Sequence, residues 1–209
     1  MSNLRESVVK DRKNEKGFTL IELLVVAAII GILLAIAIPN LVKARISANE
    51  ANARKAMQTL RDAEAEYFEQ DIDGNGSRDY TSSIGKLRAP EAQNNTEQDA
   101  LIDSSFVGAD SGITTGTGAS ACADDKAGYC VAFDDQSGGA GGGVATGTGN
   151  DLDDFGWEAS MTSFKKTGRK DFSVYGDGVI RCTLGGANGS AATGSAGNFD
   201  SDRADPACD

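Results

Sequence analysis

One long apolar segment near the start of the chain limits what the sequence can fold into. From Phe18 to Ile38 almost every residue is apolar, and Glu22 is the single charged residue. About 20 such residues form a helix long enough to cross the hydrocarbon core of a membrane. A basic flank precedes the segment, as in an export signal. However, the small residue Gly17 lies before the apolar run, whereas a secretory leader places its cleavage site after it.

Glu22 is the unusual residue of this segment. A carboxylate in an apolar helix must find a cation, a hydrogen-bond donor or water, and is usually functional. The unpaired N–H groups and the dipole at the start of a helix favour a negative charge there. Two interpretations remain open from the spacing alone. Glu22 either reaches the lipid headgroups without a partner, or pairs with a positive group of a neighbouring helix and sets the stagger between the two.

The residues Gly17-Phe18-Thr19-Leu20-Ile21-Glu22-Leu23 resemble the prepilin signature of type IV pilins and type II secretion pseudopilins. The resemblance covers about the first quarter of the chain. It implies that a prepilin peptidase cuts between Gly17 and Phe18 and that Phe18 becomes the N-methylated terminus. It also implies that the new amine of one subunit pairs with Glu22 of the next. Pro39 lies where the family commonly has a proline, just past the membrane span.

This resemblance implies a structural subunit that assembles with copies of itself into a helical filament. The partners are then the prepilin peptidase, the pilus or secretion assembly machinery, and the inner membrane that holds the precursor before it joins an extracellular pilus. A type II secretion pseudopilin is the alternative within this class. From a different class, the chain would be a membrane-anchored calcium-binding module. The large Gly- and Ser-rich remainder and the late cysteines favour a pilus subunit.

Charge and composition exclude several function classes. Removing the leader, residues 1–17 with net charge +2, from a chain of net charge −11 leaves −13 on the side chains. A strongly acidic exported part argues against nucleic acid as a partner. The sequence has no histidine, which removes the commonest general base and every Ser-His or Cys-His arrangement. We therefore expect that this protein is not an enzyme.

The periodicity predicts an α+β fold built on one helix from Phe18 to Gln70, about 80 Å long at 1.5 Å per residue. We expect Pro39 to kink or loosen this helix near Ala35 and Ile36. Past the proline, one face carries an apolar stripe that should pack on a globular head formed by residues 71–209. The stripe comprises Ile46, Ala53, Met57, Leu60 and Tyr67.

The head is predicted to contain a small antiparallel sheet of three or four strands. Alternating or apolar runs at 129–133, 156–161, 171–175 and 179–182 are typical of strands. The Gly176-Asp177-Gly178 turn between the last two runs predicts a hairpin. The low-complexity stretches 108–118 and 137–149 are predicted to be loops.

The stretch after the long helix has the spacing of a calcium-binding loop. Asp71, Asp73, Asn75, Ser77 and Asp79 occupy positions one, three, five, seven and nine, and Gly76 lies at the sharp turn. Position twelve is Ser82 rather than glutamate, and no obvious second helix follows. A polar turn that ends the helix explains the same residues. Ca²⁺ is thus a candidate cofactor.

Four cysteines lie beyond the membrane segment: Cys122, Cys130, Cys182 and Cys208. In an exported head they predict two disulfides, with three connectivities open, and free thiols remain the alternative. Proximity in sequence favours Cys122–Cys130 and Cys182–Cys208. The second pair would close a C-terminal loop, as in many type IV pilins.

Overall fold

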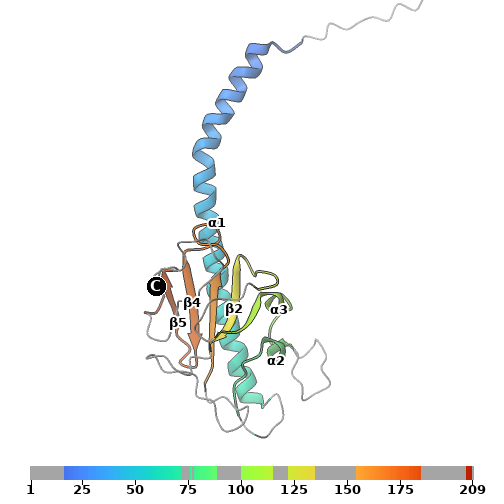
Figure 1. Ribbon diagram of the computed structural model, residues 1–209, viewed down its shortest axis with the longest axis vertical. Coiled ribbons are helices and arrows are strands. Elements are labelled where there is room, and N and C mark those ends of the chain that lie inside the picture. The colour runs from blue at the N-terminus through green and yellow to red at the C-terminus, as the bar shows by residue number, and fades with distance from the viewer. Residues whose placement is uncertain are drawn as a thin grey trace, which may run out of the picture. The chain divides into compact units, whose positions relative to one another are not determined.

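The computed structural model describes residues 17–71, 76, 78–88, 100–114, 122–134, 154–184 and 206–208. Within them the elements follow the order α1–α2–α3–β1–β2–β3–β4–β5 (Figure 1). The chain forms two compact units, Met1–Leu41 and Val42–Asp209, which are described separately. Residues 1–16, almost all of the expected leader, lie outside the described residues.

Helix α1 spans Leu20–Gln70 and contains 51 residues, which confirms the long helix predicted from the sequence. It runs through Pro39 without a break in the helix, although a proline has no N–H to donate to the carbonyl four residues earlier. The helix ends where Asp71 adopts a positive φ of 45°. A residue in this left-handed conformation commonly terminates a helix.

In the first unit, the apolar side chains of α1 face outward. Every Leu, Ile and Val from Leu20 to Leu41 is between 49 % and 82 % exposed. Within the described residues, α1 is the one helix long and apolar enough to cross a membrane. An apolar surface of this extent needs lipid or the apolar surface of another chain around it.

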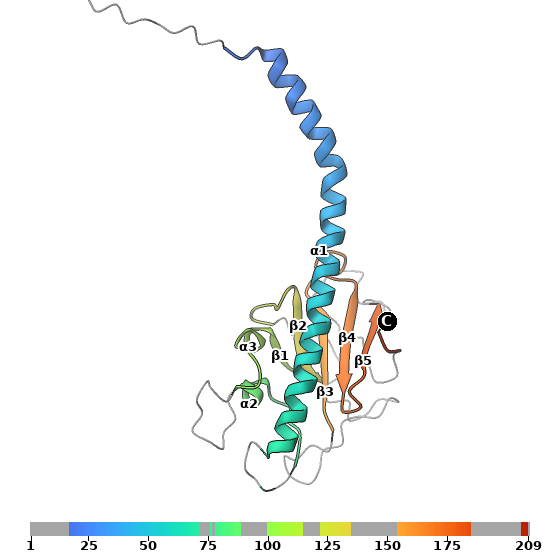
Figure 2. The ribbon, with the colours of Figure 1, turned by 180° about the vertical axis from the view of Figure 1, so that it is seen from behind.

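In the second unit, the remainder of α1 lies across one face of the sheet, as the two opposite views show (Figures 1 and 2). All five residues of the predicted apolar stripe are buried, which confirms the stripe. Three further residues of α1 are buried on the same side: Ala56, Ala63 and Glu64. The head is therefore built around the second half of this helix.

In the part of the chain that the structure describes, the sheet has five strands in the order β1-β2-β3-β4-β5. Strands β2 to β5 form an antiparallel meander, as predicted. The strand bounds are β1 Asp110–Thr114, β2 Tyr129–Asp134, β3 Gly156–Met161, β4 Lys170–Tyr175 and β5 Ile180–Leu184. Alternate residues of the middle strands join the core with α1, namely Tyr129, Val131, Phe133, Trp157, Ala159, Met161, Phe172 and Val174.

Strand β1 corrects the prediction that residues 108–118 form a loop. It pairs in parallel with β2, with Asp110 opposite Val131 and Thr114 opposite Asp134. The sheet is therefore one strand larger than expected, and that strand is parallel. The composition of this segment carries no strand signal. Its pairing comes from main-chain groups at the edge of β2, which bond a neighbouring strand whatever its side chains.

Two short helices and one turn complete the head. Helix α2, Ile84–Arg88, follows the acidic stretch directly, where the sequence predicted no obvious helix; the main-chain carbonyl of Ser83 accepts from the N–H groups of Lys86 and Leu87. Helix α3 spans Ser105–Ala109. The predicted hairpin between β4 and β5 is confirmed. Its turn closes with a 2.8 Å bond from the Gly178 N–H to the Tyr175 carbonyl.

Candidate assembly site

The start of α1 is closed by a reciprocal pair of side chains. The Thr19 N–H and hydroxyl both donate to Glu22 Oε2, at 2.9 Å and 2.7 Å. In return, the Glu22 N–H donates to the Thr19 hydroxyl oxygen at 3.3 Å. A threonine that precedes the first helical residue and a glutamate three positions later form a capping box, which satisfies N–H groups that a helix start leaves unpaired. The carboxylate of Glu22 therefore has donors within its own subunit.

The capping box leaves Glu22 able to bind a further donor. Both bonds from Thr19 end on Oε2, and among the described residues none ends on Oε1. Glu22 is exposed on a helix whose other side chains nearby are apolar. A cation brought beside Oε1 by another chain would thus meet a carboxylate already held in one orientation.

The remaining residues of the predicted motif lie on either side of this box. Gly17 and Phe18 precede the helix outside regular secondary structure, and Phe18 is 81 % exposed. Gly17 is also exposed, and among the described residues nothing lies within 4 Å of a Cβ added to it. Pro39 lies farther along the same helix, so the fold of the first unit does not place it beside Glu22.

The sequence matches known proteins in this same region. The family model of the prokaryotic N-terminal methylation motif matches residues 12–38. Type IV major pilin protein PilA of Myxococcus xanthus is 40 % identical over 79 residues, which are 38 % of this chain and 34 % of that protein. Competence protein ComGC of Bacillus subtilis is 43 % identical over 76 residues, 36 % of this chain and 71 % of ComGC. The chain belongs to the type IV pilin family.

A further relative of this pilin is the type IV wide pilus major component PilA4 of Thermus thermophilus, 66 % identical over 38 residues, 18 % of this chain and 29 % of PilA4. The matched part spans only about a third of the length of the first curated pilins. No solved structure gives a significant match. Members of the family named as pilus components are structural proteins, so this pilin is a structural subunit and not an enzyme.

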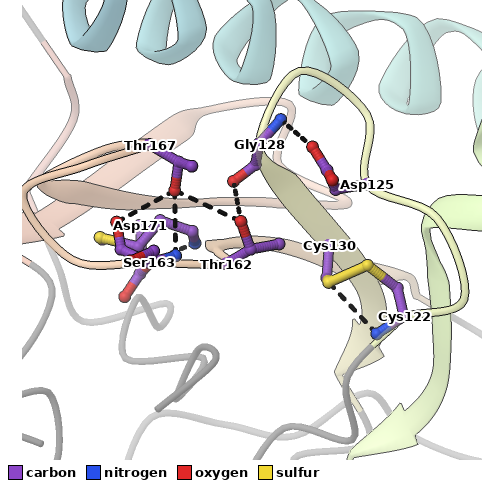
Figure 3. The surroundings of a disulfide bond; sticks show 9 residues. Cys122, Asp125, Gly128, Cys130, Thr162, Ser163, Thr167 and Asp171 are labelled. Atoms are coloured by element: carbon purple, nitrogen blue, oxygen red, sulfur yellow. Dashed lines mark hydrogen bonds between the residues drawn. A yellow bond between two sulfur atoms is a disulfide. The ribbon is translucent and has the colours of Figure 1, made fainter. Parts of the chain in front are cut away.

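The pilin head carries two disulfides that pair cysteines close in sequence. Cys122 and Cys130 form an S–S bond of 2.05 Å with Cα atoms 5.6 Å apart, and the Cys122 N–H also faces Cys130 Sγ at 3.3 Å (Figure 3). Cys130 belongs to β2 and is 4 % exposed. Beside it, the Thr162 hydroxyl donates to the Gly128 carbonyl at 3.1 Å (Figure 3). The bond ties the chain before β2 to the sheet.

The second disulfide, Cys182–Cys208, attaches the end of the chain to β5. The Cys182 N–H donates to the Pro206 carbonyl at 3.3 Å, and the Cys208 N–H donates to the Ile180 carbonyl at 3.0 Å. These bonds surround an antiparallel bridge between Arg181 and Ala207. The last residues therefore continue the sheet beyond β5. All four cysteines are paired.

The acidic stretch after α1 is only partly described. Asp73, Asn75 and Ser77 lie outside the described residues. Asp71 Oδ2 accepts from the Gly76 N–H at 3.1 Å, and Oδ1 is buried with no hydrogen-bond partner among the described residues. Asp79 is 5 % exposed, inside the head. Among the described residues no three acidic, cysteine or histidine side chains gather as a metal site, so calcium binding stays a prediction.

Sequence reasoning missed two residues that the structure shows to matter. Thr19 had a signal, because Thr-x-x-Glu before an apolar run is the capping-box pattern. Glu64 lies on the buried side of α1, four residues after Leu60 and three before Tyr67. It is the one acid among the buried residues of α1. The many exposed charges on the other faces of the helix obscure it.

Proposed function

We propose that this pilin is the subunit of a type IV pilus-like filament on the cell surface. A prepilin peptidase cuts between Gly17 and Phe18 and so removes the leader. Before assembly, the first half of α1 anchors the subunit in the inner membrane. The assembly machinery then transfers it into a homopolymer. Apolar helices form the filament core and the acidic heads form its outer surface.

One observation supports this proposal: the only charged side chain in the exposed apolar part of α1 is the Glu22 carboxylate, which Thr19 holds through Oε2. Packing between apolar helices supplies attraction but little register, because many offsets bury similar surface. A positive amine at Phe18 of one subunit, paired with Glu22 of the next, selects one offset. Repetition of such a head-to-tail contact, which does not close a ring, produces a helical filament.

A type II secretion pseudopilin remains the second candidate, because both kinds of protein share the N-terminal signature. The Cys182–Cys208 bond, which closes the end of the chain onto β5, favours the pilus subunit. Surface filaments built from this chain under native expression would support the pilus. Filaments restricted to strains that overproduce a secretion system would support the pseudopilin.

Mass spectrometry of the mature protein is the experiment that tests processing. We expect a chain that begins at Phe18, carries one added methyl group and lacks four hydrogens because of two disulfides. Cleavage after Gly17 depends on a residue without a side chain beside the cut, so Gly17→Val should leave the precursor whole. An uncut, unmethylated chain in mature filaments would contradict the proposal.

Calcium binding after α1 is a separate, smaller proposal, supported by the buried Oδ1 of Asp71. We expect calcium to raise the unfolding temperature of the full chain in detergent, and a chelator to reverse the change. At calcium a hundredfold above Kd the stabilisation is about 2.7 kcal/mol. Asp71→Asn should remove the effect, whereas Asp62→Asn, at an exposed residue on the same helix, should keep it. An equal response in the two variants would contradict a site at Asp71.

A further inference from the structure

Glu64 is a fully buried acid that connects three parts of the head. It lies on α1 with an exposed fraction of 0 %. Its Oε1 accepts from the indole N–H of Trp157 in β3 at 2.8 Å. Its Oε2 accepts from the main-chain N–H of Thr81 at 3.1 Å. One carboxyl group therefore joins the helix, the sheet and residues 78–83, which we name the post-helix segment.

The surroundings of Glu64 oppose its negative charge. Leu60, Tyr67 and Trp157 around it are almost completely buried. Burial, the largest effect, raises the pKa of Glu64 to about 8; the bonds from Thr81 and Trp157 oppose this rise, and the charge of Asp79 adds to it. Both hydrogen bonds come from neutral groups, which compensate a buried charge less than a cation would.

Charged groups from each part packed against this pocket act on it. Asp79 comes from the post-helix segment and acts on Glu64 directly. Tyr80 has its pKa raised by burial first, then by Asp154 before β3, by Glu64 and by Glu69 of α1. Arg78 of the post-helix segment brings a cation, which pairs with Glu69 at 3.6 Å. Ionisation of Glu64 would thus add a negative charge that Asp79 opposes.

We propose that Glu64 is a proton-binding site of the pilin head that controls how firmly the post-helix segment is held against α1 and β3. As a neutral acid, Glu64 keeps acceptor capacity for the Trp157 and Thr81 N–H groups without a buried charge. As a carboxylate, it requires water. The post-helix segment, which contains Thr81, is the part that can move to admit this water.

The post-helix segment is the movable partner because the other two are fixed by regular structure. Glu64 belongs to a helix of 51 residues. Trp157 belongs to β3, which pairs with β2 on one side and β4 on the other. Residues 78–83 belong to no helix or strand of the described chain, and their ring contacts are those of Tyr80 with Phe68 at 4.7 Å and with Phe155 at 5.1 Å. Loss of the proton is therefore expected to loosen this segment first.

The direction of the pH dependence follows from the two states of Glu64. Its pKa is higher in the folded head than the ordinary value of 4.5. Between about 4.5 and about 8 the folded head binds a proton that the unfolded chain has lost. Stability contributed by Glu64 is complete below that range and decreases as the pH rises through it.

The test is an NMR titration of the full chain in detergent micelles, with a chelator present so that no divalent cation alters the charge near Asp79. Trp157 is the only tryptophan, so its indole N–H gives one unambiguous resonance. In the wild type we expect this resonance to titrate with a midpoint at least two pH units above that of an exposed glutamate. The protection of the Thr81 amide against hydrogen exchange should fall at least tenfold across the same range.

Two variants separate this role from a merely structural one. Glu64→Gln keeps an acceptor for Trp157 but cannot ionise, so both responses should disappear. Glu66→Gln, at an exposed position two residues along the helix, should leave both unchanged. If Glu64→Gln fails to fold, the carboxyl carbon of Glu64 in isotope-labelled wild type decides the matter. A midpoint near 4.5 there, or an indole titration that persists in Glu64→Gln, would overturn the proposal.

Discussion

Replacing Glu22 by glutamine is expected to abolish filaments while the subunit still inserts and is still processed. The helix start survives, because a glutamine at the third helical position also forms a capping box with Thr19. The substitution removes the negative charge that we propose pairs with the Phe18 amine of the neighbouring subunit. Removing one partner of a buried ion pair costs about 3–5 kcal/mol. A loss of that size lowers an association constant more than a hundredfold.

The measurement is the yield of sheared surface filaments, normalised to the amount of mature subunit in the membrane. Glu66→Gln removes one acid from an exposed position of the same helix and should leave the yield unchanged. Thr19→Ser keeps a hydroxyl donor to Glu22 and should also assemble. Wild-type filament yield from Glu22→Gln, with the same subunit order, would show that register comes from helix packing alone.

Replacing Leu60 by alanine is expected to produce a large loss of head stability. Leu60 is 0 % exposed, between α1 and the sheet. Truncating a buried leucine costs about 2–5 kcal/mol, because the transfer energy of the lost methyl groups adds to that of the cavity they leave. For a chain of this size the midpoint of thermal unfolding should fall by about 4–20 °C.

Circular dichroism of the full chain in detergent measures this change through the loss of strand signal. Gln58→Ala provides the matched control, since Gln58 is two residues earlier on the exposed side of the same helix. We expect that control within a degree or two of wild type. An equal shift in both variants would mean that α1 unfolds independently of the sheet.

The parts of the fold that could be predicted from sequence are those with a regular signal. The stripe from Ile46 to Tyr67 repeats with the helical period, and β3 and the β4–β5 hairpin alternate or carry a turn signature. Strand β1 has neither, because its partner at the edge of β2 provides main-chain bonds that are indifferent to composition. Helix α2 has only five residues, too few for a periodic pattern.

The functional residues also divide into those that a local sequence pattern predicts and those that it does not. Gly17, Phe18 and Glu22 lie in one contiguous motif within residues 12–38, which match the N-terminal methylation motif, so the amino-acid sequence alone predicts them. Glu64 could not be found that way, because its role depends on Thr81 and Trp157, which are distant in sequence and meet it only through the fold. A hydrogen bond between residues 93 positions apart leaves no local pattern.

The end of the chain has a consequence for how copies of the pilin associate. An open sheet edge displays unpaired N–H and carbonyl groups, and crowded molecules can join through such edges into unregulated aggregates. On the outer side of β5, the Cys182 N–H is bonded to the Pro206 carbonyl and the Ile180 carbonyl to the Cys208 N–H. The Cys182–Cys208 disulfide holds this pairing in place. Neighbouring heads therefore cannot pair a strand with β5 at this edge, which keeps it out of the helix-to-helix assembly that we propose.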